Sequence, residues 1–166
     1  YNGNPTIVCK ISAKNKGRMF YSDDCTKLDY ESFKGRIDET LDAILTGHPT
    51  DDPAYYIASN IIDTHLPGFR RENDLAIPRE IHPDAMDERV SIWIGGATTA
   101  TCHFDALDNI ACCVAGKRKF TIFPPDQISN LYPGPLEPTP GGQVISLVDF
   151  QNPDFQKFPP ILWFQI

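Results

Sequence analysis

A histidine and an aspartate two residues apart, His103 and Asp105, are the side chains of this sequence best suited to chemistry. On a β-strand, positions i and i+2 face the same side, so an imidazole nitrogen and a carboxylate oxygen would lie next to each other. Both are ligands for a divalent metal, and a second histidine from a distant strand would complete the facial triad of non-haem iron oxygenases. The spacing alone is not specific, because roughly 0.4 such pairs are expected by chance in this chain.

The pair lies in the part of the sequence with the strongest strand signals. Short runs rich in β-branched and aromatic residues follow one another at near-regular spacing, broken by glycines: residues 90–94, 98–104, 110–114, 119–123 and 145–148. Ala115 and Gly116 fit a turn between the third and fourth runs. Several short strands at this spacing predict a β-sandwich or barrel.

The N-terminal half mixes helical and strand signals. Leu41, Ile44 and Leu45 form an apolar stripe that predicts a helix over residues 38–45. The chain contains 15 prolines, which argue against long helices. Further elements are expected as follows: a strand at 55–57, a helical turn at 63–66, mostly loop over 70–88, and a short helix at 127–131 capped by Asp126.

Composition restricts the setting of the protein. At 166 residues a single domain is the default. The net charge of −7 disfavours electrostatic binding to nucleic acid, and no apolar run is long enough for a membrane span. The five cysteines are odd in number, form no CxxC motif and follow no visible secretory signal, so reduced thiols in a cytoplasmic protein are expected.

The segments around His103 and Asp105 resemble the cupin-like JmjC family. The resemblance rests on residues 93–105, 108–111 and 116–127, with further similarity upstream at 66–69 and downstream to residue 159. It implies a mainly β fold with some α-helix, a double-stranded β-helix or jelly roll. The expected layout is one cupin-like domain over residues 1–166, with a mixed part at 1–88 and the first part of the barrel core at 89–166.

The family's roles can be carried over position by position. His103 and Asp105 match the first two Fe(II) ligands. Arg118 stands where the family places a basic residue, more often Lys, that pairs with the distal carboxylate of the cosubstrate 2-oxoglutarate. Asn109 matches a polar position near the cosubstrate. The hydroxyl groups of Thr99 and Tyr55 are candidates for contacts to the same carboxylate, although the family's threonine usually stands one position later, where this chain has an alanine.

The largest departure from the family is the third metal ligand. No histidine follows His103, and the other three, His48, His65 and His82, lie upstream in predicted turns. We therefore expect a fragment that stops before the second iron-binding histidine, with a barrel incomplete at its C-terminus and impaired catalysis.

Three functions remain open at this point. The first is an Fe(II)- and 2-oxoglutarate-dependent hydroxylase that acts on a protein or other side chain, with a protein or peptide as partner. The second is a cupin-like binding module without catalysis. The third is a cupin that uses another divalent metal, such as zinc or manganese.

Overall fold

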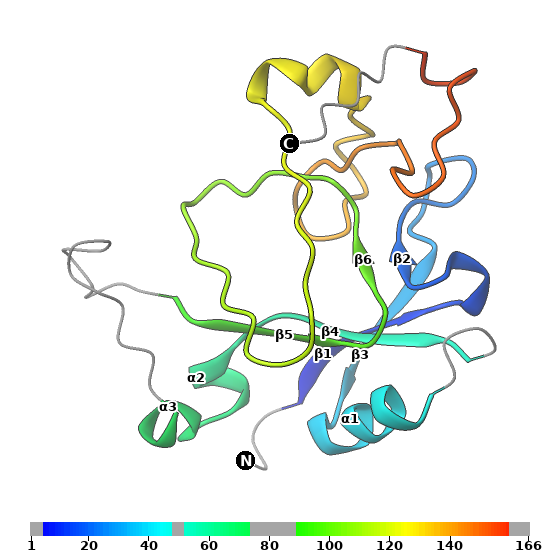
Figure 1. Ribbon diagram of the computed structural model, residues 1–166. Coiled ribbons are helices and arrows are strands. Elements are labelled where there is room, and N and C mark those ends of the chain that lie inside the picture. Colours follow the sequence, from blue (N-terminus) through cyan, green and yellow to red (C-terminus); the bar gives the residue numbers. More distant parts are fainter. Residues whose placement is uncertain (1–4, 48–51, 74–88, 160–166) are drawn as a thin grey trace. The chain divides into compact units, whose positions relative to one another are not determined.

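The computed structural model describes residues 5–47, 52–73 and 89–159, which form mainly antiparallel β-sheet with a few short helices (Figure 1). The chain divides into two compact units, one formed by Tyr1–Met19 and Asp29–Thr99, the other by Phe20–Leu28 and Ala100–Ile166. The prediction of a mainly β fold with some α-helix is confirmed. The layout predicted from the sequence, one domain with a division near residue 88, stays a prediction.

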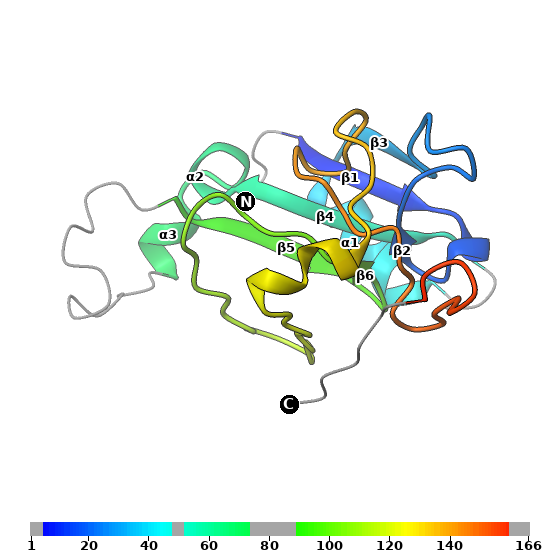
Figure 2. The same cartoon turned by 90° about the horizontal axis from the view of Figure 1, so that it is seen from above.

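The first unit is built on a four-stranded antiparallel sheet with the strand order β3-β1-β4-β5 (Figure 2). Strand β1 (Thr6–Ile11) lies between β3 (Tyr30–Gly35) and β4 (Ala54–Ile61), and β5 (Ser91–Gly95) pairs with the other edge of β4. The predicted strands at 55–57 and 90–94 correspond to β4 and β5. Both faces of the central strand β1 are covered, since Val8, Cys9 and Ile11 are all buried.

A bulge interrupts the pairing of β4 with β5. The register shifts between Ile57 and Asn60, and Ser59 adopts a positive φ of 47°. The buried Asn60 side chain then bonds the backbone of the neighbouring strand. Its amide oxygen accepts a hydrogen bond from the Ile7 N–H at 2.8 Å, and its amide nitrogen donates to the Ile7 carbonyl at 3.1 Å. Beyond the bulge, the Asn60 side chain therefore supplies hydrogen bonds to β1 at a point where the β1–β4 ladder has ended.

Helix α1 (Ile37–Thr46) covers one face of this sheet. The predicted helix at 38–45 is confirmed, but its apolar stripe begins earlier than expected. Thr40 is buried and Leu41 and Ile44 are partly buried, whereas Leu45 is 79% exposed. The helix starts at Ile37, so positions 37, 40, 41 and 44 form its inward face, and Leu45 falls outside it.

Two short helices follow β4 in the first unit. Helix α2 (Ile62–His65) confirms the predicted turn at 63–66, and α3 (Phe69–Glu72) extends into the segment 70–88 that was predicted as mostly loop. The remainder of that segment, 74–88, lies outside the described residues. Strands β2 (Arg18–Met19) and β6 (Thr99–Ala100) pair with each other. Within the described residues, no helix is both long and apolar enough to cross a membrane.

The second unit contains little regular structure. The predicted helix at 127–131 is present as a 3-10 helix, Pro125–Leu131. The predicted strands at 110–114 and 119–123 are wrong, because these residues belong to no strand. Of the predicted strand at 98–104 only β6 forms, and of the one at 145–148 only an isolated bridge between Ser146 and Pro133.

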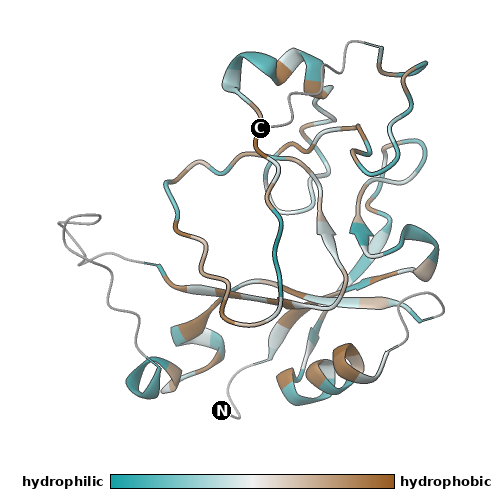
Figure 3. Ribbon diagram, viewed as in Figure 1, coloured by the Kyte–Doolittle hydropathy of each residue, from teal (hydrophilic) through white to brown (hydrophobic). Residues whose placement is uncertain are grey.

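The missing strands share one physical cause. A strand is held by hydrogen bonds to a neighbouring strand, and β-propensity alone does not replace that neighbour. We call residues 106–122 the arm. No ladder partner for the arm is present among the described residues, and its large apolar side chains are exposed: Leu107, Ile110, Val114, Phe120 and Ile122. Figure 3 shows hydrophobic stretches along it.

Candidate metal centre

The backbone just before His103 is held by a neighbouring segment of the second unit. The Ser146 N–H donates a 2.8 Å hydrogen bond to the Cys102 carbonyl, and Gly134 N–H donates to the Ile145 carbonyl. The Ser146–Cys102 bond, together with the bond between the Gln143 and Asp105 side chains, holds residues 143–146 alongside residues 102–105. Cys102 itself is half-buried, and this burial raises the pKa of its thiol. The segment 143–146 therefore positions the two candidate ligands.

His103 is oriented by its own backbone neighbourhood. Its Nδ1 lies 2.7 Å from the Thr101 carbonyl oxygen, and a carbonyl can only accept, so Nδ1 carries the proton. In the neutral ring this leaves the lone pair on Nε2, the tautomer that binds a metal through Nε2. His103 Nε2 lies 3.8 Å from Asp105 Oδ1. The two predicted ligands thus face each other.

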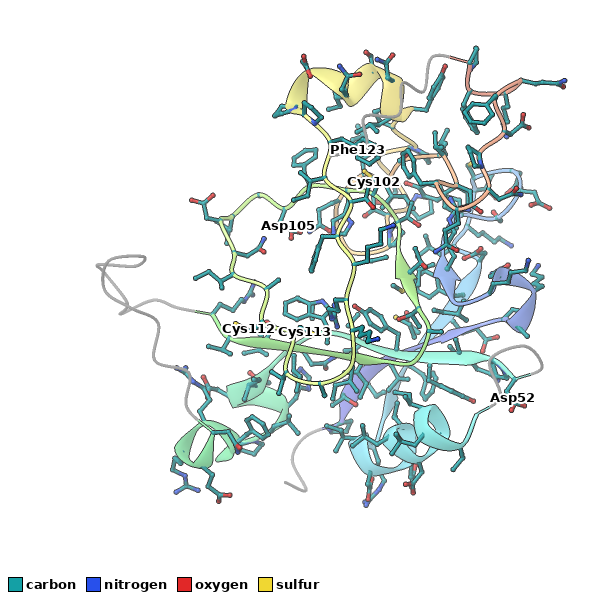
Figure 4. The ribbon with its side chains drawn as sticks, in the orientation of Figure 1. Asp52, Cys102, Asp105, Cys112, Cys113 and Phe123 are labelled. Carbon is teal, nitrogen blue, oxygen red and sulfur yellow. The ribbon has the colours of Figure 1, made fainter. Side chains whose placement is uncertain are left out.

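Two side-chain amides hold the Asp105 carboxylate. Asn109 Nδ2 donates to Oδ2 at 3.2 Å, and Gln143 Nε2 donates to Oδ1 at 2.9 Å. A carboxylate oxygen has two lone pairs, so one amide donor on each oxygen leaves acceptor capacity for a cation. Figure 4 labels Asp105 within the second unit. The carboxylate is thus oriented on both oxygens while it still offers lone pairs toward His103.

The distance between the two ligand atoms is within reach of one divalent ion, although it exceeds the roughly 3.0 Å between neighbouring positions of an octahedral site. Two metal–ligand bonds of about 2.1 Å span about 4.2 Å, which exceeds the 3.8 Å between His103 Nε2 and Asp105 Oδ1. One ion can therefore touch both atoms. Both side chains are about a third to a half exposed, at 34% and 46%. Within the residues that the structure describes, no third His, Cys, Asp or Glu joins them.

The other predicted site residues are distributed over both units. Arg118 follows Gly116, which turns the arm with a φ of 78°, and its side chain is exposed. The C-terminal end of the arm is anchored by Phe123, whose ring lies 4.8 Å from the ring of Phe150. The structure therefore places Arg118 in the same unit as the metal ligands, on a segment fixed at its end.

Tyr55 and Thr99 belong to the first unit. Tyr55 lies on β4 and lines a small cavity of about 90 Å³ together with Ala43 and Ile44 of α1. Thr99 begins β6, and its N–H donates a 2.9 Å hydrogen bond to the Gly17 carbonyl. Of the upstream histidines, His65 bonds the Pro5 carbonyl through Nδ1, whereas His48 and His82 lie outside the described residues.

Two hydrogen-bond partners of His103 and Asp105 were not predicted from the sequence. Gln143 stands 38 residues beyond Asp105 in a glycine-rich loop, and nothing in its surroundings marks it as a ligand-supporting residue. The Thr101 carbonyl belongs to the backbone, which is the same for every residue type, so the sequence carries no signal for its role. Asn109 was predicted to lie near the cosubstrate, which stays a prediction, and the structure shows its amide nitrogen bonded to Asp105.

Comparison with known proteins identifies the family. Residues 2–164 match the sequence profile of the cupin-like domain. The chain belongs to the cupin-like domain family. This match confirms the predicted resemblance and the cupin-like fold class. The antiparallel sheet and short helices of the structure are consistent with that fold. No solved structure matches the chain.

Several relatives of this cupin-like chain are JmjC-domain proteins. It is 28% identical to JmjC domain-containing protein D of Dictyostelium discoideum over 77% of this chain and 30% of that protein. It is 26% identical to lysine-specific demethylase 8 of Danio rerio over 74% and 30%, respectively. It is 32% identical to human HSPB1-associated protein 1 over 46% and 16%. The chain thus spans less than a third of the length of each of these relatives.

Proposed function

We propose that this chain is the iron-binding part of an Fe(II)- and 2-oxoglutarate-dependent hydroxylase. The observation that supports the proposal most is the pairing of His103 Nε2 with Asp105 Oδ1 at 3.8 Å, each held by its own hydrogen bonds. The cupin-like family match and the JmjC-domain relatives raise the same expectation independently. Five free cysteines accord with a cytoplasmic setting.

Each residue has a defined task in this proposal. His103 Nε2 and Asp105 Oδ1 hold the metal, and the Thr101 carbonyl and the Gln143 amide keep both in the ligating orientation. Bound Fe(II), with 2-oxoglutarate and oxygen, supplies the oxidation that places a hydroxyl group on a C–H bond.

The remaining residues act on the cosubstrate. Arg118 binds the distal carboxylate of 2-oxoglutarate, which the fork of a guanidinium can grip through two parallel hydrogen bonds. Tyr55 and Thr99 keep the role that the resemblance gives them, as hydroxyl donors to that carboxylate. Asn109 orients Asp105, and its amide oxygen is left for the cosubstrate side.

The substrate class in this proposal is a protein or peptide side chain. One relative is named as a lysine-specific demethylase, a protein-directed activity. The net charge of −7 makes a nucleic-acid substrate unfavourable, because a phosphate backbone would be repelled.

The incomplete ligand set supports a second candidate, a cupin-like binding module without turnover. His103 and Asp105 supply only two of three ligands, and the described residues offer no third. We therefore expect this chain by itself to bind Fe(II) weakly and to be impaired in catalysis.

Free imidazole separates the two candidates, because it can occupy the place of the missing ligand. The assay follows succinate formation from 2-oxoglutarate by the 166-residue chain with Fe(II), while imidazole is raised into the millimolar range. We expect succinate formation to rise with imidazole and to vanish in Asp105→Ala. Asp108→Ala is the matched control, since Asp108 lies exposed in the same loop, and it should behave as the parent chain.

Other outcomes overturn the proposal. If calorimetry detects no Fe(II) binding that depends on Asp105, the chain is a binding module. If zinc or manganese binds at Asp105 and iron with 2-oxoglutarate yields no succinate at any imidazole concentration, the site belongs to a cupin with different chemistry.

A further inference from the structure

Two adjacent cysteines, Cys112 and Cys113, lie near the middle of the arm and take no part in the proposed metal centre. Both are free and exposed, whereas Cys9 is buried and Cys25 and Cys102 are partly buried. Figure 4 labels the pair on the same stretch of the arm. On a regular strand two neighbouring side chains point to opposite faces, but these residues belong to no strand.

The backbone around the pair belongs to no helix or strand. The arm has no ladder partner among the described residues, and a turn follows directly at Gly116, where φ is 78°. The Cys113 thiol already folds back toward this turn, with its sulfur 3.7 Å from the Ala115 carbonyl oxygen and 3.8 Å from that of Gly116. A bend thus follows the pair directly, and the Cys113 side chain is turned toward it.

We infer that Cys112 and Cys113 form a two-thiol redox site that a hydroperoxide oxidises to a disulfide between adjacent residues. Exposure lets a small oxidant reach either sulfur. The two thiols are adjacent in sequence, so each always lies within reach of the other, although the small ring that joins them is strained. This site is independent of the proposed hydroxylase function.

The chemistry takes two balanced steps. The Cys112 sulfur attacks one oxygen of hydrogen peroxide, the O–O bond breaks, and the thiol proton leaves with the displaced oxygen as water. Cys112 is then a sulfenic acid. The Cys113 sulfur attacks the Cys112 sulfur, the S–O bond breaks, and the hydroxyl group leaves with the Cys113 proton as a second water. Two thiols have lost two electrons, and the peroxide has gained them.

The resulting bond is easily reversed. Adjacent Cα atoms lie about 3.8 Å apart, closer than the roughly 4.4 to 6.8 Å that an unstrained disulfide prefers. Strained disulfides are the more readily reduced ones, so a thiol reductant such as glutathione should restore both cysteines. Oxidation would also lock the arm into a tight turn at residues 112 and 113, because the small disulfide ring is incompatible with an extended strand.

The test is thiol mapping after peroxide treatment of the 166-residue chain, with a metal chelator present so that no bound iron contributes. Remaining thiols are alkylated with iodoacetamide, and the protein is digested with trypsin. Cleavage after Arg89 and Lys117 releases residues 90–117, which carry Cys102, Cys112 and Cys113. We expect this peptide to lose two hydrogens and to carry one alkyl group, on Cys102, and glutathione to reverse the change.

Three variants decide the assignment. Cys102→Ser should keep the oxidised product, because Cys102 is outside the pair. Cys112→Ser and Cys113→Ser should each abolish it. The inference is overturned if Cys102→Ser removes the product, or if peroxide leaves both arm thiols open to alkylation. Disulfide-linked dimers on a non-reducing gel, or irreversible oxidation of single cysteines in place of the reversible product, would overturn it equally.

Discussion

The side-chain amide of Gln143 donates a 2.9 Å hydrogen bond to Oδ1 of Asp105, joining two residues that lie 38 positions apart. The same oxygen faces Nε2 of His103. The glycine-rich loop that carries Gln143 therefore determines how the carboxylate presents itself to a metal. This connection makes the loop a part of the candidate metal centre, although it contributes no ligand.

Replacing Gln143 by alanine should weaken divalent-metal binding. Without the amide, the Asp105 carboxylate can rotate away from His103, and loss of such a supporting hydrogen bond typically lowers metal affinity about 10- to 100-fold. Titration of the chain with Mn²⁺ or Fe²⁺ under anaerobic conditions measures the change. Gln156→Ala is a suitable control, because the backbone N–H of Gln156, and not its side chain, makes the hydrogen bond to Asp154. Equal affinity in both variants would contradict a supporting role for Gln143.

Two consecutive glycines at the end of β5 should respond very differently to alanine. A Cβ at Gly95 would lie 2.5 Å from Cδ2 of the buried Tyr56 ring and 2.9 Å from Thr98 Oγ1. Overpacking of this kind typically lowers the free energy of unfolding by about 1 to 3 kcal/mol. A Cβ at Gly96 would meet only Ile44 Cγ2, at 4.0 Å.

The neighbouring glycine is thus the matched control. Urea unfolding followed by circular dichroism should place Gly95→Ala well below the parent chain in stability and Gly96→Ala within about 0.5 kcal/mol of it. Similar stabilities for the two variants would show that the Tyr56 ring moves aside without penalty.

Asp24 should make stability depend on acid pH. Its carboxylate accepts hydrogen bonds from the Ser22 hydroxyl at 2.6 Å and from the Thr26 N–H and hydroxyl at 3.1 and 2.8 Å. These donors lower the pKa of Asp24 from 3.8 to about 2, with the Ser22 hydroxyl as the largest cause. A pKa lower in the folded than in the unfolded chain stabilises the fold fully above about pH 4, and this contribution disappears as the pH falls toward 2.

Replacement of Asp24 by asparagine tests this expectation. The variant should unfold at lower denaturant concentration than the parent at pH 7, and the difference should shrink between pH 4 and pH 2. Asp23→Asn changes the same charge one residue earlier without touching these hydrogen bonds, so it separates their effect from that of net charge. A stability gap for Asp24→Asn that stayed constant down to pH 2 would disprove the assignment.

The sequence predicted best where local pattern and tertiary packing agree. Helix α1, strand β5 and the turn at α2 lie close to their predicted bounds, and β4 starts as predicted but continues to Ile61, four residues further than expected. The prediction went wrong in the arm, where residues 110–114 and 119–123 have strand composition but no neighbour to bond. Strand formation is a property of a pair of segments, and composition reports on only one of them.

In the candidate site, too, the features that depend on local sequence were easier to predict than those that depend on contacts between distant segments. His103 and Asp105 could be predicted as ligands because their spacing and the surrounding motif are local, and their role stays a prediction. Gln143 could not, since its role depends on a backbone bond between Ser146 and Cys102 that brings two distant segments together. The inward face of α1 was misjudged at Leu45, because the residues that turn out to face inward are Ile37, Thr40, Leu41 and Ile44, and Leu45 lies at the edge of this group.

The Asn60 side chain helps to determine the register in which β1 pairs with β4. Its amide bonds both the N–H and the carbonyl of Ile7, and also the Ala58 carbonyl, so it imitates one more residue of a strand. Sliding β1 by a single residue along β4 would break the two bonds to Ile7 and move Val8 to the opposite face of the sheet. The Asn60 side chain thus fixes the register of β1 against β4, because either register shifted by one residue would lose these hydrogen bonds.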